Sequence, residues 1–190
     1  ILDENELAKG YDYFAVGGRN ISPDNNWLAY GVDTLSRRIY EVHFKNLNTG
    51  EVLNNTISNS TGSVAWANDN QTVFYTSKNQ TTLLGEKIWR HKVGKNTPDK
   101  MMYYEKDDTY YNGVYRSKSG KFIIIYHSST LISDYQILSA NNPDGKFKKF
   151  TPRDFDHEYS IDHYKDKFYI VTNWQAKNNR LMETPDSKTS

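Results

Sequence analysis

Side chains that can hold a metal ion gather in one short segment near the end of the chain. His157 and His163 flank Glu158 and Asp162 in the sequence His-Glu-Tyr-Ser-Ile-Asp-His. On an extended strand, residues six apart lie on the same face, so the two imidazoles could meet one metal ion. Their spacing fits no standard histidine motif for a metal, and polar side chains in strands and loops are common without one. We therefore predict no metal site and no cofactor.

Paired carboxylates, the groups that glycoside hydrolysis requires, occur twice. Asp107-Asp108 is one pair, and Asp154 with Asp156 is the other. Adjacent acids in a connecting segment more often form a solvated turn, so carbohydrate cleavage is a minor alternative. A stacking platform for sugars is the matching hypothesis for three tryptophans, Trp66, Trp89 and Trp174. Aromatic residues at such spacings more often fill a core.

No nucleophile or phosphate loop is evident in the sequence. A serine on a nucleophile elbow needs a glycine on either side, and Gly62-Ser63 lacks the second one. Gly94-Lys95 has neither the earlier glycine nor the following Ser or Thr of a phosphate-binding loop. We therefore predict no catalytic residue in this chain. The double arginine Arg37-Arg38 is either a surface pair or reaches the carboxylates of a partner domain.

Composition excludes several classes of partner. The chain of 190 residues has 24 basic and 23 acidic side chains, a formal net charge of +1, and no basic stripe for nucleic acid. Its longest apolar run, Phe122–Tyr126, is far shorter than a membrane helix, so we expect no membrane association. The absence of cysteine excludes disulfides and favours a cytoplasmic location. Without an initiator Met or a signal-peptide pattern, the chain is expected to belong to a longer translation product.

A strand, turn and strand pattern recurs four times and must position these side chains. The copies are Ile21–Tyr30, Ala65–Tyr75, Arg116–Tyr126 and Tyr164–Val171. Tyr30 and Tyr75 are 45 residues apart, and Tyr75 and Tyr126 are 51 apart. Lys121 and Lys167 are 46 apart. Periods of this size, with short strands rich in aromatic and β-branched residues, are typical of β-propeller blades.

The predicted fold is all-β, a partial β-propeller with three to four blades of four-stranded antiparallel sheet. Residues 1–17 are expected to form a short helix, for which Asp3 and Glu6 have capping-box spacing, and a lead-in strand over Tyr11–Val16 that ends at Gly17-Gly18. The remaining ranges are blades at 18–57, 62–105 and 111–152, an incomplete blade at 157–185 and a frayed tail at 186–190. Such an arc leaves apolar blade faces and strand edges open, so self-association is expected.

Seven segments in order resemble the propeller of the oligopeptidase B (protease II) group in the prolyl oligopeptidase family of serine peptidases. They are LDENELAKG (2–10), SPDNNWLAYGVDTLSRR (22–38), FKNLNTG (44–50), VAWANDNQTVFY (64–75), IWRHKVG (88–94), EKDDTYY (105–111) and DHEYSIDHY (156–164). The resemblance covers essentially the whole chain.

The resemblance implies an arc of a seven-bladed propeller that caps an α/β-hydrolase domain of the same parent protein. That domain carries a Ser-Asp-His triad, and the family group cleaves short peptides after Arg or Lys. The implied role of the propeller is to admit short peptides and exclude folded proteins. Asp12 and Arg38 lie in matching motifs, and we hypothesise that they latch the two domains or contact a basic substrate. The alternatives are a surface pair within the propeller and, for the whole chain, a stand-alone partial propeller that binds peptides or proteins.

Overall fold

The computed structural model describes residues 1–154 and 156–189. One short helix, α1 (Glu4–Leu7), begins after Asp3, whose carboxylate accepts hydrogen bonds from the Asn5 and Glu6 amides. The strands in chain order are β1 (Ala15–Ile21), β2 (Trp27–Asp33), β3 (Tyr40–Asn46), β4 (Ile57–Trp66), β5 (Thr72–Lys78), β6 (Gly85–Lys92), β7 (Lys100–Tyr104), β8 (Tyr111–Arg116), β9 (Phe122–Ser128), β10 (Ser133–Ser139), β11 (Lys148–Lys149), β12 (Tyr159–Tyr164), β13 (Lys167–Thr172) and β14 (Arg180–Pro185). No helix of the described ranges is long and apolar enough to cross a membrane.

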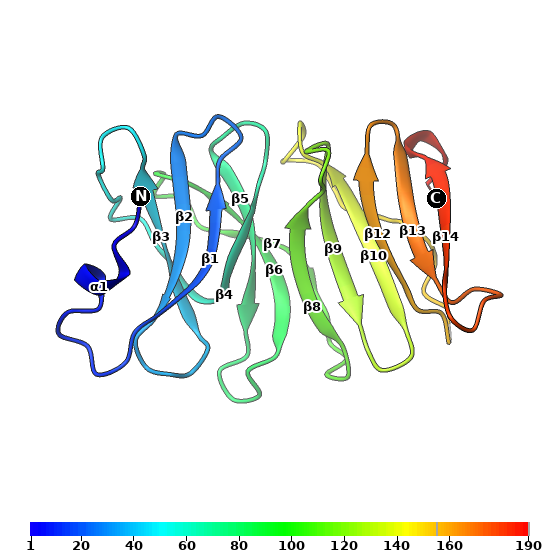
Figure 1. Ribbon diagram of the computed structural model, residues 1–190, viewed down its shortest axis with the longest axis horizontal. Helices are drawn as coiled ribbons and strands as arrows, with labels where there is room; N and C mark the ends of the chain where they lie inside the picture. The colour runs from blue at the N-terminus through cyan, green and yellow to red at the C-terminus, as the bar shows by residue number, and fades with distance from the viewer. Residues whose placement is uncertain (155, 190) are drawn as a thin grey trace.

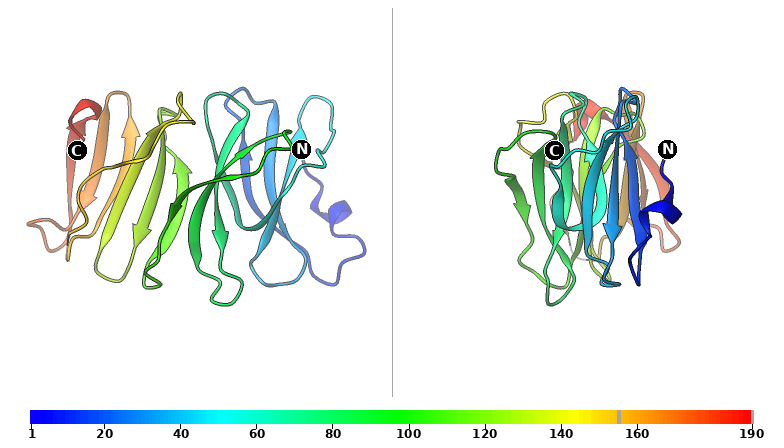
Figure 2. Two further views of the ribbon diagram at one scale, coloured as in Figure 1. Left: turned by 180° about the vertical axis from the view of Figure 1, so that it is seen from behind. Right: turned by 90° about the vertical axis from the view of Figure 1, so that its left-hand side faces the viewer.

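The strands form three antiparallel sheets that stand side by side in an arc (Figure 1). The first sheet has the order β1 to β7, the second runs β11-β10-β9-β8, and the third runs β12-β13-β14. The two chain ends lie at opposite ends of the arc, and long connections cross its outer side (Figures 1 and 2). The prediction of an all-β propeller arc is confirmed.

Strand β4 belongs to two blades. Its first residues pair with β3, since Ile57 faces Val42 and Ser60 faces Tyr40, while Val64–Trp66 pair with β5. The register shifts between these two parts, where Gly62 adopts a φ of 92°. We therefore call β1 to β3 with 57–60 blade 1, and 61–66 with β5 to β7 blade 2. Blade 3 is β8 to β11, and blade 4 is β12 to β14.

The predicted lead-in strand begins later than expected and does not stop at the double glycine. Tyr11–Val16 was the predicted range, whereas β1 starts at Ala15 and runs through Gly17 and Gly18 to Ile21. The glycines serve close packing here, because a Cβ on Gly18 would lie 2.0 Å from the Ser63 hydroxyl oxygen on β4.

The tail over 186–190, predicted to be frayed, forms a single 3-10 turn at Asp186–Lys188. The Asp186 amide donates to the Asp166 carbonyl at 3.0 Å, and its carboxylate lies 3.7 Å from the Lys121 ammonium of blade 3. Ser190 lies outside the described residues.

The repeat alignment predicted for blade 3 is wrong by one residue. Tyr75 packs with Phe44 and Trp66 between blades 1 and 2, whereas Tyr126 packs against the cluster between blades 3 and 4. Successive side chains of a strand point to opposite faces, so a shift of one residue reverses the face. The blade 3 counterpart of Tyr75 is therefore Ile125, which is fully buried.

Each boundary between successive blades is filled by its own apolar cluster. Phe44, Trp66 and Tyr75 are the large members between blades 1 and 2. Tyr159 and Phe168 belong to the cluster between blades 3 and 4. Burial of these clusters holds neighbouring blades face to face, and no single central core forms.

Candidate functional site

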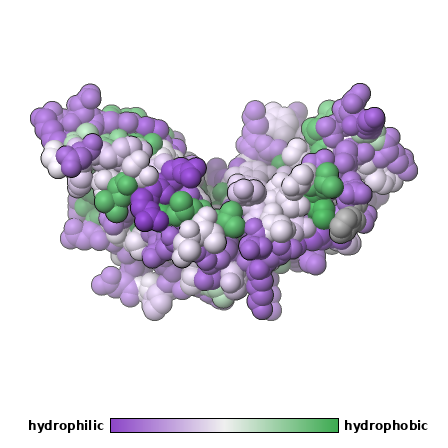
Figure 3. Space-filling model, turned by 90° about the horizontal axis from the view of Figure 1, so that it is seen from below, coloured by the Kyte–Doolittle hydropathy of each residue, from purple (hydrophilic) through white to green (hydrophobic). Residues whose placement is uncertain are grey.

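The hairpin loops between the second and third strands of the blades all lie along the same side of the arc, the lower side in Figure 1. Large apolar side chains occur in all four loops, and three of them are strongly exposed: Leu35 at 76%, Leu131 at 54% and Trp174 at 49%. The turns between the first and second strands lie on the opposite side, at 22–26, 67–71, 117–121 and 165–166, and carry mainly polar residues. The longest connection on that side, 47–56, includes one strongly exposed apolar side chain, Val52. We call the side with the hairpin loops the hairpin end and the opposite side the turn end. Figure 3 views the hairpin end and shows hydrophobic side chains set among hydrophilic ones.

Asp33 shapes the hairpin loop of blade 1. Its buried carboxylate accepts hydrogen bonds from the Leu35 amide at 2.9 Å and from the Arg38 amide at 2.7 Å. Arg38 adopts a φ of 54°, a left-handed conformation that these bonds stabilise. The Lys78 ammonium of blade 2 donates to the Arg38 carbonyl at 2.7 Å. The exposed Arg38 side chain is thereby held at the boundary between two blades.

Arg38 and Lys78 share a pocket of about 370 Å³ with Tyr111 and Tyr126 of blade 3. Burial lowers the pKa of Lys78, and the neighbouring Arg38 charge lowers it further. In the described ranges, no ion pair joins the Arg38 side chain to a carboxylate. The pocket is therefore positively charged at neutral pH and suits a carboxylate better than a basic substrate side chain.

The structure does not pair Asp12 with Arg38. Asp12 is exposed, and no ion pair between the two is found within 1–154 and 156–189. The segment 8–14 that contains Asp12 descends to the hairpin end (Figure 1). Both residues thus belong to the same end of the molecule, each open to an external partner.

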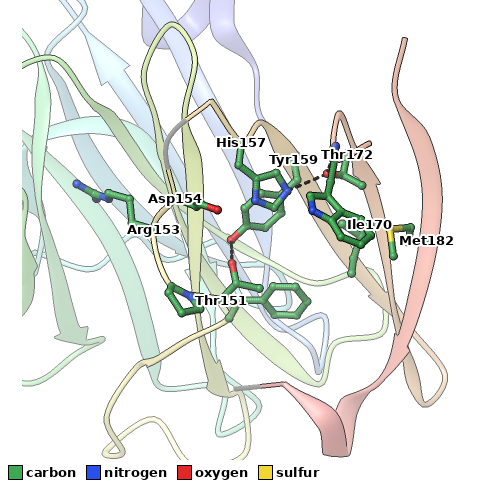
Figure 4. A pocket seen from close by; sticks show the side chains of 11 residues that line it. Thr151, Arg153, Asp154, His157, Tyr159, Ile170, Thr172 and Met182 are labelled. Atoms are coloured by element: carbon green, nitrogen blue, oxygen red, sulfur yellow. Dashed lines mark hydrogen bonds between the residues drawn. The ribbon is translucent and has the colours of Figure 1, made fainter. Parts of the chain in front are cut away.

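A second pocket, of about 500 Å³, lies between blade 4 and the connection that follows β11 (Figure 4). The lining is mainly apolar, and it is supplied by Phe150, Thr151, Pro152, Arg153, Asp154, His157, Tyr159, Ile170, Thr172, Trp174 and Met182. The Thr151 and Tyr159 hydroxyls lie 2.7 Å apart, and His157 Nε2 lies 2.9 Å from the Thr172 hydroxyl. The polar groups are thus engaged with each other, and the pocket offers shape and apolar surface.

Two constellations considered from the sequence do not assemble. His157 contacts Thr172, whereas His163 places Nδ1 2.7 Å from the Ser119 hydroxyl of blade 3. The tryptophans are dispersed as well, because Trp66 is buried between blades 1 and 2 while Trp174 is half exposed on a blade 4 loop. Neither a shared metal site nor a stacking platform forms from these residues.

The sequence did not single out Asp33, Lys78 or Tyr111. The available signal for Asp33 was its position just before the double arginine, where an Asp commonly caps a turn. Lys78 and Tyr111 come from other blades, so no local pattern could have joined them to Arg38.

The comparisons with known proteins agree with this geometry. Residues 1–190 match the family model described as the prolyl oligopeptidase N-terminal β-propeller domain. The chain is 41% identical to dipeptidyl aminopeptidase BI of Pseudoxanthomonas mexicana, covering 100% of this chain and 26% of the relative. It is 32% identical to protease 2 of Moraxella lacunata, covering 97% and 27%.

Solved structures give the same result. Oligopeptidase B from Trypanosoma brucei superposes with a TM-score of 0.86 at 28% identity, covering 100% of this chain and 27% of that chain. For oligopeptidase B from Leishmania major the TM-score is 0.90 at 23% identity, which shows the shared fold, with coverage of 99% and 27%. The chain spans about a quarter of the length of these relatives. The chain therefore belongs to the prolyl oligopeptidase family, as a part of its N-terminal β-propeller.

Proposed function

We propose that this chain is the non-catalytic, access-limiting part of a serine peptidase of the oligopeptidase B group, which cleaves short peptides after Arg or Lys. The observation that carries the proposal is the full-length match to the propeller model, supported by 32% identity to protease 2 and 28% identity to an oligopeptidase B structure. The propeller limits substrates by size, since a folded protein cannot pass its ring.

The hairpin end is the surface on which we place the α/β-hydrolase domain of the parent protein. Exposed apolar loop tips supply contact area at this end, and the opposite end has polar turns. Arg38 and Asp12 add charges of opposite sign, each without an ion-pair partner within the described ranges. Arg38 takes a carboxylate of the partner domain in this proposal, and Asp12 takes a basic group of the domain or of the substrate.

Arg38→Ala and Asp12→Ala variants of the whole protein test this placement. Loss of a latch should change the kcat/KM for basic peptides by roughly tenfold, equivalent to about 1.4 kcal/mol. Arg37→Ala is the matched control, because Arg37 is the adjacent exposed arginine and donates only to the Gln80 carbonyl. An unchanged kcat/KM in both variants would show that neither Arg38 nor Asp12 contributes to the contact between the domains or to substrate binding.

A dipeptidyl aminopeptidase is the second candidate activity. It is favoured by the 41% identity to dipeptidyl aminopeptidase BI, which exceeds the identity to protease 2. The two candidates differ in their need for a free substrate amino terminus.

The decisive assay offers the whole protein a short peptide with Arg at the cleavage position, once with a blocked and once with a free amino terminus. Cleavage of the blocked peptide supports the oligopeptidase, and release of dipeptides from the free peptide alone supports the aminopeptidase. Cleavage of neither, in a protein of only about 22.1 kDa on an immunoblot of source cells, would favour the stand-alone interaction module.

A further inference from the structure

The boundary between blades 2 and 3 differs in side-chain size from its two neighbours. Its buried cluster combines three alanines, Ala65, Ala67 and Ala140, with Phe74, Ile123 and Leu138. The partly buried Met102, Val114 and Phe147 pack against this cluster. Several buried aromatic side chains fill each of the other two boundaries. Alanine buries less apolar area than an aromatic side chain, so large buried aromatic side chains contribute less to this boundary than to the other two.

No strand pairing crosses this boundary in the described residues. At the boundary of blades 1 and 2, β4 runs through both blades and pairs with β3 as well as with β5. Between blades 2 and 3 the sheet ends at β7, and β8 starts a separate sheet. Blades 1 and 2 therefore form one continuous unit, to which blade 3 is attached by side chains and loop contacts.

Ion pairs join blades 2 and 3 at both ends. At the turn end, Arg90 of β6 lies 2.6 Å from the Asp144 carboxylate and donates to the Pro143 carbonyl at 3.1 Å. At the hairpin end, Arg153 pairs with Glu105, which follows β7, at 2.7 Å. Arg153 also pairs with Asp134 of its own blade.

A third arginine enters the same boundary without a carboxylate. Arg116 at the end of β8 donates to the Asn68 side-chain oxygen of blade 2 at 2.6 Å, and its Nε is buried without a partner. Burial lowers the pKa of Arg116. Packing of blade 2 against blade 3 therefore stabilises the charged Arg116 side chain little, because neutral oxygens offset only part of the cost of removing its charge from water.

The neighbouring boundaries depend much less on charge. Across blades 3 and 4, the cross-boundary pair of a basic and an acidic side chain is Lys121 with Asp186 at 3.7 Å. Across blades 1 and 2, none is found in the described parts of the chain. Ion pairs between blades are thus concentrated at the boundary of blades 2 and 3.

We propose that the boundary of blades 2 and 3 is a salt-sensitive seam, along which the arc parts into a unit of blades 1 and 2 and a unit of blades 3 and 4. Small apolar side chains and ion pairs hold the seam closed, and the Arg90–Asp144 pair, whose carboxylate is exposed, is the one that salt screens. Rising ionic strength therefore loosens this boundary first. In the peptidase proposed above, and resting on that function, parting of the seam admits longer peptides from the side of the ring.

Hydrogen exchange of two matched amides in the whole protein tests the seam. The Asn68 amide crosses it, donating to the Ala140 carbonyl at 2.9 Å, and the Ser119 amide crosses the next boundary, donating to the His163 carbonyl at 2.9 Å. Raising sodium chloride from about 0.05 M to about 0.5 M should speed exchange at Asn68 about fivefold and leave Ser119 unchanged. Equal salt responses at the two amides would overturn the proposal.

Arg90→Gln is the variant of choice, because Asp144 is 67% exposed and stays solvated when its partner is lost. We expect faster exchange at Asn68 already at low salt and a weaker salt response. Lys167→Gln, which removes an exposed ion pair with Glu183 inside blade 4 and away from the seam, is the control and should behave as the parent protein. A parent-like salt response in Arg90→Gln would contradict the ionic seam.

The consequence for access is read from the ratio of cleavage rates for a long and a short peptide with the same cleavage site. Arg90→Gln should raise this ratio about twofold, and Lys167→Gln should not. An unchanged ratio would overturn lateral admission. Failure to cleave either peptide would count against the proposed peptidase, and the exchange rates would still decide the seam.

Discussion

The carboxylate of Asp99 lies between two side chains of blade 2. Its Oδ1 is 2.7 Å from His91 Nδ1, and its Oδ2 accepts a hydrogen bond from the Tyr75 hydroxyl at 2.8 Å. The second nitrogen of His91, Nε2, lies 2.7 Å from the side-chain oxygen of Asn55, in the connection between β3 and β4 of blade 1. The buried His91 ring stacks on Phe44 with centroids 5.6 Å apart. One carboxylate thus connects the outer strand of blade 2 to the contact with blade 1.

Asp99→Ala should destabilise the propeller by about 2–3 kcal/mol, because it leaves His91 and the Tyr75 hydroxyl without their acceptor. Urea unfolding followed by tryptophan fluorescence measures the change. Asp166→Ala, whose exposed side chain has no hydrogen bond of its own in the described structure, should cost less than about 0.5 kcal/mol. Similar costs for the two variants would contradict a structural role of Asp99.

Gly31→Ala should cost about 3 kcal/mol or more, since the added Cβ would lie 2.6 Å from the backbone of Gly62. Neither backbone can move without separating blades 1 and 2. Gly50→Ala is the comparison, because Gly50 has a positive φ of 80° but open space around it. Its cost should be about 1 kcal/mol, from backbone strain alone. The order of the two unfolding midpoints tests the close approach of the strands.

His127 should make the propeller less stable in acid. The side chain is fully buried, and burial lowers its pKa to about 4 from 6.5. A lowered folded-state pKa means that the unfolded chain binds the proton first, so stability present above pH 6.5 is lost as the pH falls towards 4.

The expected loss between pH 7 and pH 5 is about 2 kcal/mol, measured by urea unfolding. In His127→Gln this part of the pH dependence should disappear, because the amide does not titrate. An unchanged pH dependence in the variant would assign the acid sensitivity to other groups.

Leu131→Glu should weaken contact between the propeller and its partner domain and leave the propeller folded, because Leu131 is 54% exposed at a hairpin tip. We expect greater susceptibility of the whole protein to proteolysis between its domains, with an unchanged propeller unfolding midpoint. Lys118→Glu, exposed in a turn at the opposite end, is the control. Equal protease sensitivity in the two variants would reject the hairpin end as the docking surface.

Most of the fold could be predicted from local pattern. Polar turn residues such as Asp69 and Asn70 punctuate short strands, and the repeat period fixed the number of blades. The register of blade 3 could not be predicted, because Ile125 and Tyr126 are both suitable for a buried strand and only packing decides which faces blade 2. The extent of β1 through Gly17 and Gly18 depended on the approach of Ser63, which is distant in sequence.

The candidate site likewise contains residues that the sequence indicated and residues that only the tertiary structure revealed. Arg38 stood out in the sequence because paired charges at the start of a strand are unusual, and the resemblance to a peptidase family added Asp12. Their proposed pairing with each other could not be judged without coordinates. Lys78 and Tyr111 could not be found from the sequence, because they meet Arg38 only when three blades stack. Asp33 bonds to the Arg38 amide within one hairpin loop, so only its turn-capping position could have indicated it.

By itself, the sequence determined that this protein is a repeated antiparallel β-structure, since period, turn chemistry and strand composition act over a few residues. The tertiary structure alone decided which blade boundary is filled by large aromatic side chains and which is joined by the ion pairs of Arg90 and Arg153. It also decided that apolar tips such as Leu35 and Trp174 share one end of the arc. The physical reason is distance along the chain, because these contacts join residues that no local propensity links.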